Sequence, residues 1–237
     1  NLAIALATRN YRVGVLDADI HGPSIPKMLG MRGSQLIAGP AGVFPAQGPL
    51  DIRVVSFDLL VDEETPVIWR GPLKMTAIRQ LLSDITWGDL DYMLIDLPPG
   101  TGDEPLSIAQ LIPDMDGVIL VTIPSEVSQL VVRKAVTFAN RLNLPIIGII
   151  ENMSVFVCPN CGARVEIFGS GGGKAVAEAT GIRLLGSIPI DPAVCKDSDR
   201  GVAFISEHPE SESAKAFLEI VDKIHKIVGG VEQGVDR

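Results

Sequence analysis

The apolar residues of this chain fall into short runs, and two of these runs end in an acidic residue. Residues 12–17 (Arg-Val-Gly-Val-Leu-Asp) and 92–96 (Tyr-Met-Leu-Ile-Asp) both close on an aspartate. An apolar run without polar alternation is typical of a strand in the parallel sheet of an α/β domain, where helices cover both faces. We therefore expect residues 92–95 to form a strand with both faces buried.

Strand and helix patterns alternate along the chain. Apolar positions at helical spacing predict helices at residues 1–8, 24–29, 73–85, 104–111, 126–142, 175–180 and 213–227. Short apolar runs predict further strands at residues 52–57, 117–122, 145–151, 164–168 and 184–188, and the segment 30–49 is a loop or hairpin. This alternation predicts right-handed crossovers and an α/β fold with a doubly wound, mostly parallel sheet flanked by helices.

Length, charge and cysteine content limit the class of protein. With 237 residues, 46% of them hydrophobic, we expect one domain at residues 1–228 and a flexible tail at 229–237. A net charge of -9 disfavours nucleic acid or an anionic membrane as a partner. No apolar run is long enough to span a bilayer, and three cysteines favour a reducing compartment over a disulfide framework. We expect a cytoplasmic protein.

The acidic strand ends are the first candidate site. Asp96 is followed by a Pro-Pro-Gly-Thr-Gly turn, which suits a Mg²⁺-phosphate site with a loop that moves when a phosphate leaves. Asp17 and Asp19, one residue apart, suit a nucleotide hydrolase that places one carboxylate near a metal and the other near a water. The alternatives are an acidic turn residue at Asp96 and a helix cap at Asp17 or Asp19.

Polar residues also follow two later strands. Asn152 offers a donor and an acceptor for the edge of a nucleobase, although a turn-forming asparagine is the alternative. Pro189 and Asp191 follow the strand predicted at 184–188, on the same ligand-binding edge. Trp69 and Arg70 suit either a contact with a partner or phosphate, or an arginine stacked on a half-buried tryptophan.

A pair of cysteines forms the second candidate site. Cys158-Pro-Asn-Cys161-Gly predicts a knuckle in which both sulfurs face one metal ion or cluster. A tetrahedral thiolate site needs four ligands, and the remaining cysteine, Cys195, is distant in sequence. Two chains that contribute a pair each would complete the set, whichever the metal. A thioredoxin-like redox pair is disfavoured because residues 164–168 have a strand pattern, not a helical one.

The glycine-rich segment 168–175 (Phe-Gly-Ser-Gly-Gly-Gly-Lys-Ala) is similar to a phosphate-binding loop but fails its requirements. The spacing is one residue short, and Ala175 stands where a Ser or Thr hydroxyl should bind Mg²⁺. We expect a flexible turn that caps the helix at 175–180, with backbone amides that can still contribute to an anion site.

Six segments together resemble the Mrp/Nbp35 family of iron-sulfur carrier ATPases, which includes the ApbC proteins. They are residues 16–26 (LDADIHGPSIP), 69–72 (WRGP), 94–103 (LIDLPPGTGD), 151–154 (ENMS), 158–161 (CPNC) and 185–191 (LGSIPID). The resemblance covers nearly the whole chain. That family belongs to the deviant Walker-type P-loop ATPases, together with MinD, ParA and nitrogenase iron protein, so the resemblance implies their fold.

The resemblance implies roles for the first group of residues in the binding and hydrolysis of ATP. Asp17 and Asp19 would lie in switch I, with Asp19 orienting the attacking water. Asp96 would be the Walker B acid that acts on Mg²⁺ through water. Residues 98–102 would form switch II, with the amide of Gly100 near the γ-phosphate.

The second group would bind the base and the metal. Asn152, Pro189 and Asp191 would surround adenine, and Cys158 and Cys161 would bridge a [4Fe-4S] cluster between two subunits. The implied protein is a cytosolic homodimeric ATPase that passes the cluster to apo iron-sulfur proteins. The alternatives are a MinD- or ParA-like positioning ATPase with a structural zinc at the cysteine pair, and a scaffold without hydrolytic activity.

One part of the family pattern is not in this sequence. The glycine-rich P-loop, with two lysines and a Mg²⁺-binding Ser or Thr, belongs immediately before the helix at residues 1–8. That helix pattern begins without a capping residue ahead of it. We therefore expect a P-loop NTPase domain whose N-terminal strand and P-loop precede Asn1.

Overall fold

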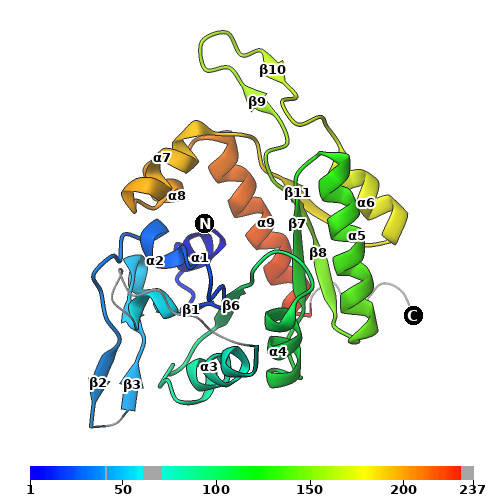
Figure 1. Cartoon of the computed structure of the whole chain (residues 1–237). Coiled ribbons are helices and arrows are strands. Elements are labelled where there is room, and N and C mark those ends of the chain that lie inside the picture. Colours follow the sequence, from blue (N-terminus) through cyan, green and yellow to red (C-terminus); the bar gives the residue numbers. More distant parts are fainter. Residues whose placement is uncertain (41, 61–70, 231–237) are drawn as a thin grey trace. The chain divides into compact units, whose positions relative to one another are not determined.

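The computed structural model describes residues 1–40, 42–60 and 71–230 (Figure 1). The chain divides into two compact units, each built around its own sheet. The first contains Asn1–Ile112 and Ala193–Glu207, and the second contains Pro113–Pro192 and His208–Arg237. The single domain expected at residues 1–228 stays a prediction. Trp69, Arg70 and most of the expected tail lie outside the described residues.

The first unit has a four-stranded sheet in which three strands are parallel. Its order is β4 (Ala46–Gln47), β5 (Arg53–Ser56), β1 (Val13–Asp17) and β6 (Tyr92–Asp96), with β4 antiparallel to β5. All five residues of β1 are buried, as expected for a central parallel strand. The segment expected as a loop or hairpin contains the antiparallel hairpin of β2 (Ile37–Gly39) and β3 (Gly42–Phe44).

The expectation that β6 is buried on both faces is wrong. Residues 92–95 are only partly buried, and Asp96 is exposed. The physical reason is the position of the strand: β6 is the last in the order of its sheet and pairs with β1 alone among the described strands. The apolar run therefore identified the strand and its direction but not its place in the sheet.

Helices of the first unit follow the predicted alternation, with four additions among the described residues. The predicted helices are α1 (Leu2–Ala7), α2 (Ile25–Met28), α3 (Gly71–Ser83) and α4 (Asp103–Leu111). Two short 3-10 helices, η1 (Pro49–Asp51) and η2 (Phe57–Leu59), flank β5. The sequence did not predict α7 (Pro192–Arg200) and α8 (Phe204–Glu207), because both helices are short and most residues of α7 are polar, which leaves few apolar positions to show a helical pattern.

The second unit has a parallel sheet in the order β11 (Leu184–Ser187), β8 (Ile146–Glu151) and β7 (Val118–Thr122). The helices α5 (Glu126–Arg141) and α6 (Gly172–Thr180) lie on one side of this sheet and α9 (Glu212–Val228) on the other (Figure 1). A buried cluster of Val132, Ile149, Val176 and Ala177 joins α5 and α6 to β8. A second antiparallel hairpin, β9 (Phe156–Val157) and β10 (Arg164–Val165), carries the cysteine pair.

Two sequence expectations in this unit need correction. The strand expected at residues 164–168 is only the two residues of β10. The flexible turn expected before residue 175 is partly helix, since α6 already begins at Gly172. Gly172 and Gly173 are buried there, and a Cβ on Gly172 would lie 2.3 Å from the carbonyl oxygen of Pro124. These glycines allow close packing of the backbone.

Both units show parallel strands flanked by helices, as the alternation predicts. The carboxyl ends of parallel strands in each sheet meet at one edge, and this is the edge where ligands bind in open α/β sheets. Throughout the described ranges, no helix has the length and apolar character needed to cross a membrane.

Candidate functional site

The structure brings two of the predicted acids together at the edge of the first sheet. The parallel register pairs Asp17 of β1 with Asp96 of β6, and the amide of Ala18 donates to the carbonyl oxygen of Asp96 at 2.9 Å. Neighbouring strands are about 4.8 Å apart, so the two carboxylates lie close together at the carboxyl edge of the sheet. Asp19 follows two residues after Asp17 in the loop that leaves this edge.

Asp17 is fully buried and holds the loop that follows it. Its Oδ2 accepts hydrogen bonds from the amides of Ser24 (3.1 Å) and Ile25 (3.2 Å) and from the hydroxyl of Ser56 (3.2 Å). Its Oδ1 accepts from the amide of Asp19 at 3.2 Å. The carboxylate therefore binds the first backbone amides of α2, which agrees with the helix-cap alternative for this residue.

The acids at this edge are held in an environment that favours a cation. Burial, with the nearby charge of Asp96 in addition, raises the pKa of Asp17 from 3.8 to about 6. Burial and the charge of Asp19 also raise the pKa of Asp96, although solvent screens part of this effect because Asp96 is exposed. Carboxylates whose pKa values are raised in this way are stabilised as anions by a bound divalent cation.

One carboxylate oxygen of Asp19 accepts hydrogen bonds from the backbone, and the other accepts none from the described residues. It is partly buried, and its Oδ1 accepts hydrogen bonds from the amides of His21 and Gly22, both at 3.1 Å. No described residue donates a hydrogen bond to its Oδ2. The turn thus fixes the carboxylate through one oxygen and leaves the second to accept a proton or a hydrogen bond from water.

The turn after β6 leads into a buried ion pair that sequence analysis missed. Gly100 in this turn has a φ of +104°, a conformation that L side chains rarely adopt. In the first turn of α4, Glu104 accepts a 2.7 Å hydrogen bond from Lys74 of α3, and their side chains are 9% and 15% exposed. Burial opposes ionisation of Glu104, but the hydrogen bond and charge of Lys74, with a contribution from His21, keep its pKa below the usual value.

A signal for this pair was present in the sequence. Lys74 occupies the same helical stripe as Ala77, Ile78 and Leu81, which are all buried. A lysine on an apolar stripe needs a buried partner of opposite charge, but the sequence does not identify which acid that is. Ser56 was missed for a similar reason: it ends β5 beside Asp17, and its role depends on the register between strands.

The predicted base-binding residues follow two neighbouring strands of the second sheet. Asn152 directly follows β8, and its amide donates to the carbonyl oxygen of Thr122 at 2.7 Å. Its side-chain Oδ1 accepts from the amide of Met153 at 3.0 Å, as a turn-forming asparagine would, while no described residue binds its Nδ2. Pro189 lies just past β11, where its carbonyl oxygen accepts from the hydroxyl of Ser213 at 3.2 Å.

The segment that contains Pro189 and Asp191 is tied to the strand that leads to the cysteine pair. The amide of Ser154 donates to the carbonyl oxygen of Ile188 at 2.9 Å, and the amide of Ile190 donates to that of Val155 at 2.7 Å. Phe156, the first residue of β9, also forms a parallel bridge with Ile190. Residues 188–190 therefore support the base of the β9–β10 hairpin.

The cysteine pair lies in a tight turn at the tip of this hairpin, which we call the knuckle. The amide of Cys158 donates to the carbonyl oxygen of Ala163 at 2.9 Å, and the amide of Gly162 donates back to Cys158 at 2.8 Å. The amides of Asn160 and Cys161 donate to the sulfur of Cys158 and lower its pKa, which favours the thiolate that binds metals. Cys158 is partly buried and Cys161 is exposed; neither is in a disulfide.

The knuckle offers two candidate metal ligands, and no third lies with them within the part of the chain that the structure describes. No group of three or more His, Cys, Asp or Glu side chains there is placed to hold a metal ion. The third cysteine, Cys195, is exposed on α7 and belongs to the first unit. A four-thiolate site at this knuckle therefore needs ligands beyond the three cysteines of this sequence.

Two further features lie outside the predicted sites. The amide of Gly173, at the start of α6, donates to the buried carboxylate of Glu151 at 2.5 Å, so a protein carboxylate already occupies that amide.

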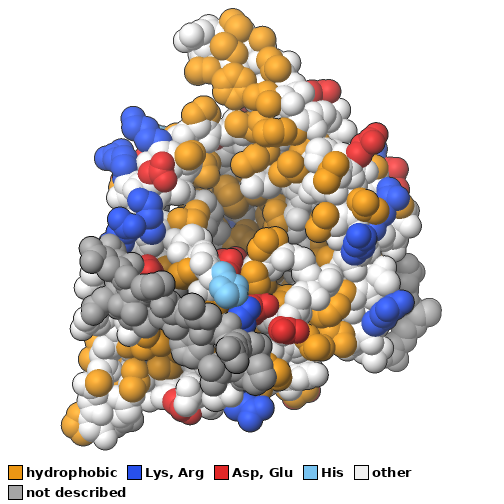
Figure 2. Space-filling view, in the orientation of Figure 1, with side chains coloured by type: hydrophobic (Ala, Val, Ile, Leu, Met, Phe, Trp, Pro, Cys, Tyr) orange, Lys and Arg blue, Asp and Glu red, His pale blue; other side chains and the backbone are white. Residues whose placement is uncertain are grey.

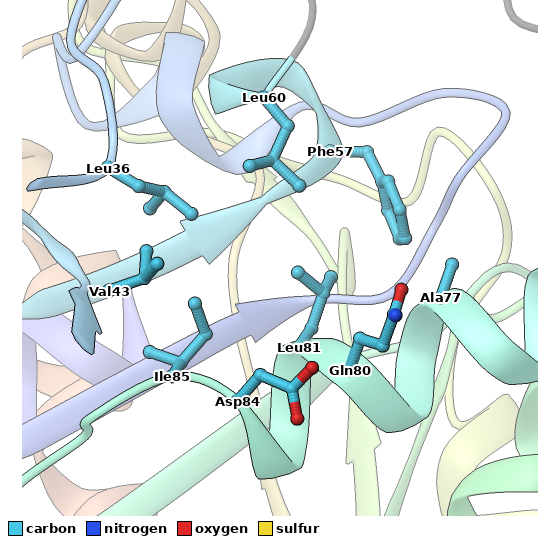
Figure 3. Close-up of a pocket in the computed structure, with 9 residues that line it drawn as sticks. All are labelled: Leu36, Val43, Phe57, Leu60, Ala77, Gln80, Leu81, Asp84 and Ile85. Carbon is cyan, nitrogen blue, oxygen red and sulfur yellow. The ribbon is translucent and has the colours of Figure 1, made fainter. Parts of the chain in front are cut away.

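An apolar cavity of about 400 Å³ lies beside α3 and the β2–β3 hairpin (Figure 3). None of the predicted site residues lines it; the lining residues are Leu36, Val43, Phe57, Leu60, Ala77, Gln80, Leu81, Asp84 and Ile85.

Solved structures define the class of protein. A nucleotide-binding protein from Archaeoglobus fulgidus, solved in complex with ADP, is 37% identical, with a TM-score of 0.77 over 92% of this chain and 83% of that chain. The cell division ATPase MinD of Pyrococcus furiosus has a TM-score of 0.68 over 95% of this chain and 90% of its own, and at 21% identity it shows the fold alone. The fold is that of MinD- and ParA-type P-loop NTPases, as predicted.

Sequence relatives define the family. Residues 1–225 match the family model described as ParA, NUBPL iron-transfer P-loop NTPase. The iron-sulfur cluster carrier protein of Saccharolobus solfataricus is 53% identical over 96% of this chain and 77% of its own length. The protein of the same name from Methanocaldococcus jannaschii is also 53% identical, over 98% of this chain and 80% of its own. The chain belongs to this family of iron-transfer P-loop NTPases, which confirms the resemblance found in its motifs.

Proposed function

We propose that this protein is an ATP-dependent iron-sulfur cluster carrier. It binds a [4Fe-4S] cluster between two copies of the chain and transfers it to apo iron-sulfur proteins. The observation that carries the proposal is the knuckle: two thiols, Cys158 and Cys161, stand on a protruding hairpin with no further ligand among the described residues. The names of the relatives at 53% identity support iron-sulfur clusters as the cargo.

In this proposal, the acids of the first unit act in the binding of Mg²⁺ and the hydrolysis of ATP. Asp96 binds Mg²⁺ through water, and buried Asp17 supports it by fixing the loop between β1 and α2. The amide of Gly100 contacts the γ-phosphate. The free Oδ2 of Asp19 orients the water that attacks the γ-phosphorus, and the bond to the departing ADP breaks as the new P–O bond forms.

In this proposal, the residues that follow β8 and β11 bind the adenine base of ATP. Nδ2 of Asn152 donates to the adenine ring, and Pro189 and Asp191 flank it. The protein acts as a cytoplasmic homodimer and needs neither a membrane nor a nucleic acid as partner. Its acidic charge of -9 supports that last point, because it repels phosphate backbones and anionic lipids.

Metal content tests the cargo. Full-length protein purified without oxygen and reconstituted with ferrous iron and sulfide should contain four irons and four sulfides per two chains and show visible cluster absorbance. Cys158→Ala and Cys161→Ala should lose it, because each removes a ligand from the shared set. Cys195→Ala is the matched control and should retain it. A preparation that binds only zinc would instead support a structural metal site in a positioning ATPase.

Phosphate release tests the ATPase assignment. In the full-length protein with Mg²⁺ and ATP, Asp19→Ala should reduce the rate about 100-fold or more, the range typical for a lost group that handles the attacking water. Asp114→Ala, at an exposed turn residue of the second unit, is the control and should keep the wild-type rate. A scaffold without hydrolytic activity would show no rate that depends on Asp19.

A further inference from the structure

The turn that follows β6 has little support of its own. Its residues 99–102 are exposed, and no described residue accepts a hydrogen bond from the amides of residues 100–102. At the first end of the turn, the carbonyl oxygen of Asp96 accepts a hydrogen bond from the amide of Ala18 at 2.9 Å. A segment without bonds of its own is positioned by the groups that hold its two ends.

Glu104, in the first turn of α4, holds the second end. It is 7% exposed, and its two carboxylate oxygens have different neighbours. Oε1 accepts a 2.7 Å hydrogen bond from Lys74, and Oε2 lies over Gly102, where it would be 3.3 Å from a Cβ on that glycine. The side chain therefore folds back onto the last residue of the turn, in an orientation that Lys74 fixes.

The burial of Lys74 calls for an explanation beyond stability. Figure 2 shows the lysine and arginine side chains of the displayed face mostly toward its outer parts, whereas the side chain of Lys74 is only 15% exposed. It reaches Glu104 from α3, which lies beside α4 (Figure 1). A buried ion pair adds little stability compared with two well-packed apolar side chains. What the pair adds is a fixed direction, because a charge-assisted hydrogen bond is specific in its geometry.

Glu104 also lies near the loop that carries Asp19. Burial raises the pKa of Glu104, but the hydrogen bond and charge of Lys74 lower it, and the charge of His21 acts in the same direction as Lys74. The amide of His21 donates to Oδ1 of Asp19 at 3.1 Å. The carboxylate of Glu104 is thus close to both segments to which the proposed function gives a role in hydrolysis.

We propose that Lys74 is a positioning residue for ATP hydrolysis: it holds the carboxylate of Glu104, and this carboxylate fixes the turn that presents the amide of Gly100 to the γ-phosphate. Without the charge of Lys74, the carboxylate turns toward water and the second end of the turn loses its support. The inference rests on the proposed function and adds to it a residue that acts through another.

Steady-state kinetics of the full-length protein with Mg²⁺ and ATP test the proposal. Lys74→Met should lower kcat about tenfold or more, because a misplacement of about 1 Å at a reacting group can cost about 100-fold. The KM for ATP should change less than about threefold, since the lost interaction acts in the transition state and not in binding. Lys174→Met, which breaks an exposed pair on α6, is the matched control and should keep both constants.

A double variant separates positioning from a loss of stability. Lys74→Met/Glu104→Met replaces the pair by two apolar side chains and leaves no buried charge unpaired, so its melting temperature should return toward that of the wild type. Its kcat should stay as low as that of Lys74→Met. A kcat that recovers together with the melting temperature would show that the pair only stabilises the fold, and would overturn the proposal.

Nuclear magnetic resonance measures the turn itself and does not depend on hydrolysis. In the full-length protein without nucleotide, the amides of residues 100–102 should have order parameters near about 0.85 in the wild type and in Lys174→Met, and below about 0.6 in the double variant. A turn that is already flexible in the wild type, or that is unchanged in the double variant, would overturn the proposal. A wild type that hydrolyses no ATP would refute the proposed function, while the order parameters would still decide whether Lys74 and Glu104 hold the turn.

Discussion

Replacement of Asp17 by asparagine tests whether the folded protein holds this carboxyl group in an unfavourable charge state. The side chain is fully buried at the end of β1, and burial raises its pKa from 3.8 to about 6. In the unfolded chain the carboxyl group of Asp17 regains its ordinary pKa of about 3.9. Asparagine has nearly the same shape but does not titrate, so it removes this difference between the two states.

The magnitude follows from the shift of about two units, each worth about 1.36 kcal/mol. Because the folded state binds the proton more tightly than the unfolded state, the stabilising contribution is complete below about pH 4 and is lost as the pH rises through about 6. Between these limits Asp17 should lower the free energy of unfolding by about 3 kcal/mol. The Asp17→Asn variant should lack this loss.

Asparagine also has a cost that does not depend on pH. The carboxylate accepts four hydrogen bonds through two oxygens, and an amide has only one oxygen to offer. At least one buried N–H is left without an acceptor, which costs about 1–3 kcal/mol. The absolute stability of the variant is therefore a poor test, and its pH dependence relative to the wild type is the informative quantity.

Urea unfolding of both proteins, free of nucleotide and metal, at several values from pH 4 to 7 supplies this quantity. The free energy of unfolding of Asp17→Asn minus that of the wild type should rise by about 2 kcal/mol over this range, which covers most of the full difference, because most other titrating groups cancel in the difference. A difference that stays flat across the range would refute the reasoning. It would show that the four hydrogen bonds fully offset the burial of the charge.

Two further predictions concern packing. Lys74→Met should reduce the free energy of unfolding in urea by about 2–4 kcal/mol, because it removes the buried cation that pairs with Glu104. Lys174→Met is the control: it breaks a pair with Glu178 whose side chains are 72% and 69% exposed, and should cost less than about 1 kcal/mol. Equal losses of unfolding free energy in the two variants would contradict this reasoning. Gly172→Ala should cost about 1–3 kcal/mol, since its Cβ would lie 2.3 Å from the oxygen of Pro124, and an unchanged melting temperature would show that the backbone yields there.

Features that depend on short stretches of sequence were predictable. An apolar run that ends in an acid identified β1 and β6, and the rule that ligands bind at the carboxyl ends of parallel strands pointed to Asp96 as a site residue. The pairing of Asp17 with Asp96 became visible only in the register of the two strands. The Cys-Pro-Asn-Cys spacing predicted the knuckle, because Pro and Gly leave a tight turn few alternatives. The family followed from motifs spread over most of the chain.

Features that depend on which elements meet in space were not predictable. The partial exposure of β6 follows from its place in the strand order, and the partner of Lys74 lies thirty residues away on another helix. The glycines at the start of α6 suggested a mobile turn, whereas their function in the fold is to let the backbone pass close to Pro124 and Glu151. Composition alone does not distinguish these two uses of glycine.

The support of the β9–β10 hairpin has a consequence for how this protein can change during evolution. Its bonds to residues 188–190 join main-chain groups of Ser154, Val155, Ile188 and Ile190, and the hydroxyl of Ser154 adds one side-chain bond to the carbonyl oxygen of Ile188 at 3.1 Å. Main-chain bonds do not depend on side-chain identity, so substitutions at positions other than Ser154 can accumulate in both segments without loosening the hairpin. A single insertion between residues 152 and 156 would instead shift the pairing by one residue and turn each side chain of β9 to the opposite face. Selection should therefore act more strongly on the length of this segment than on its composition.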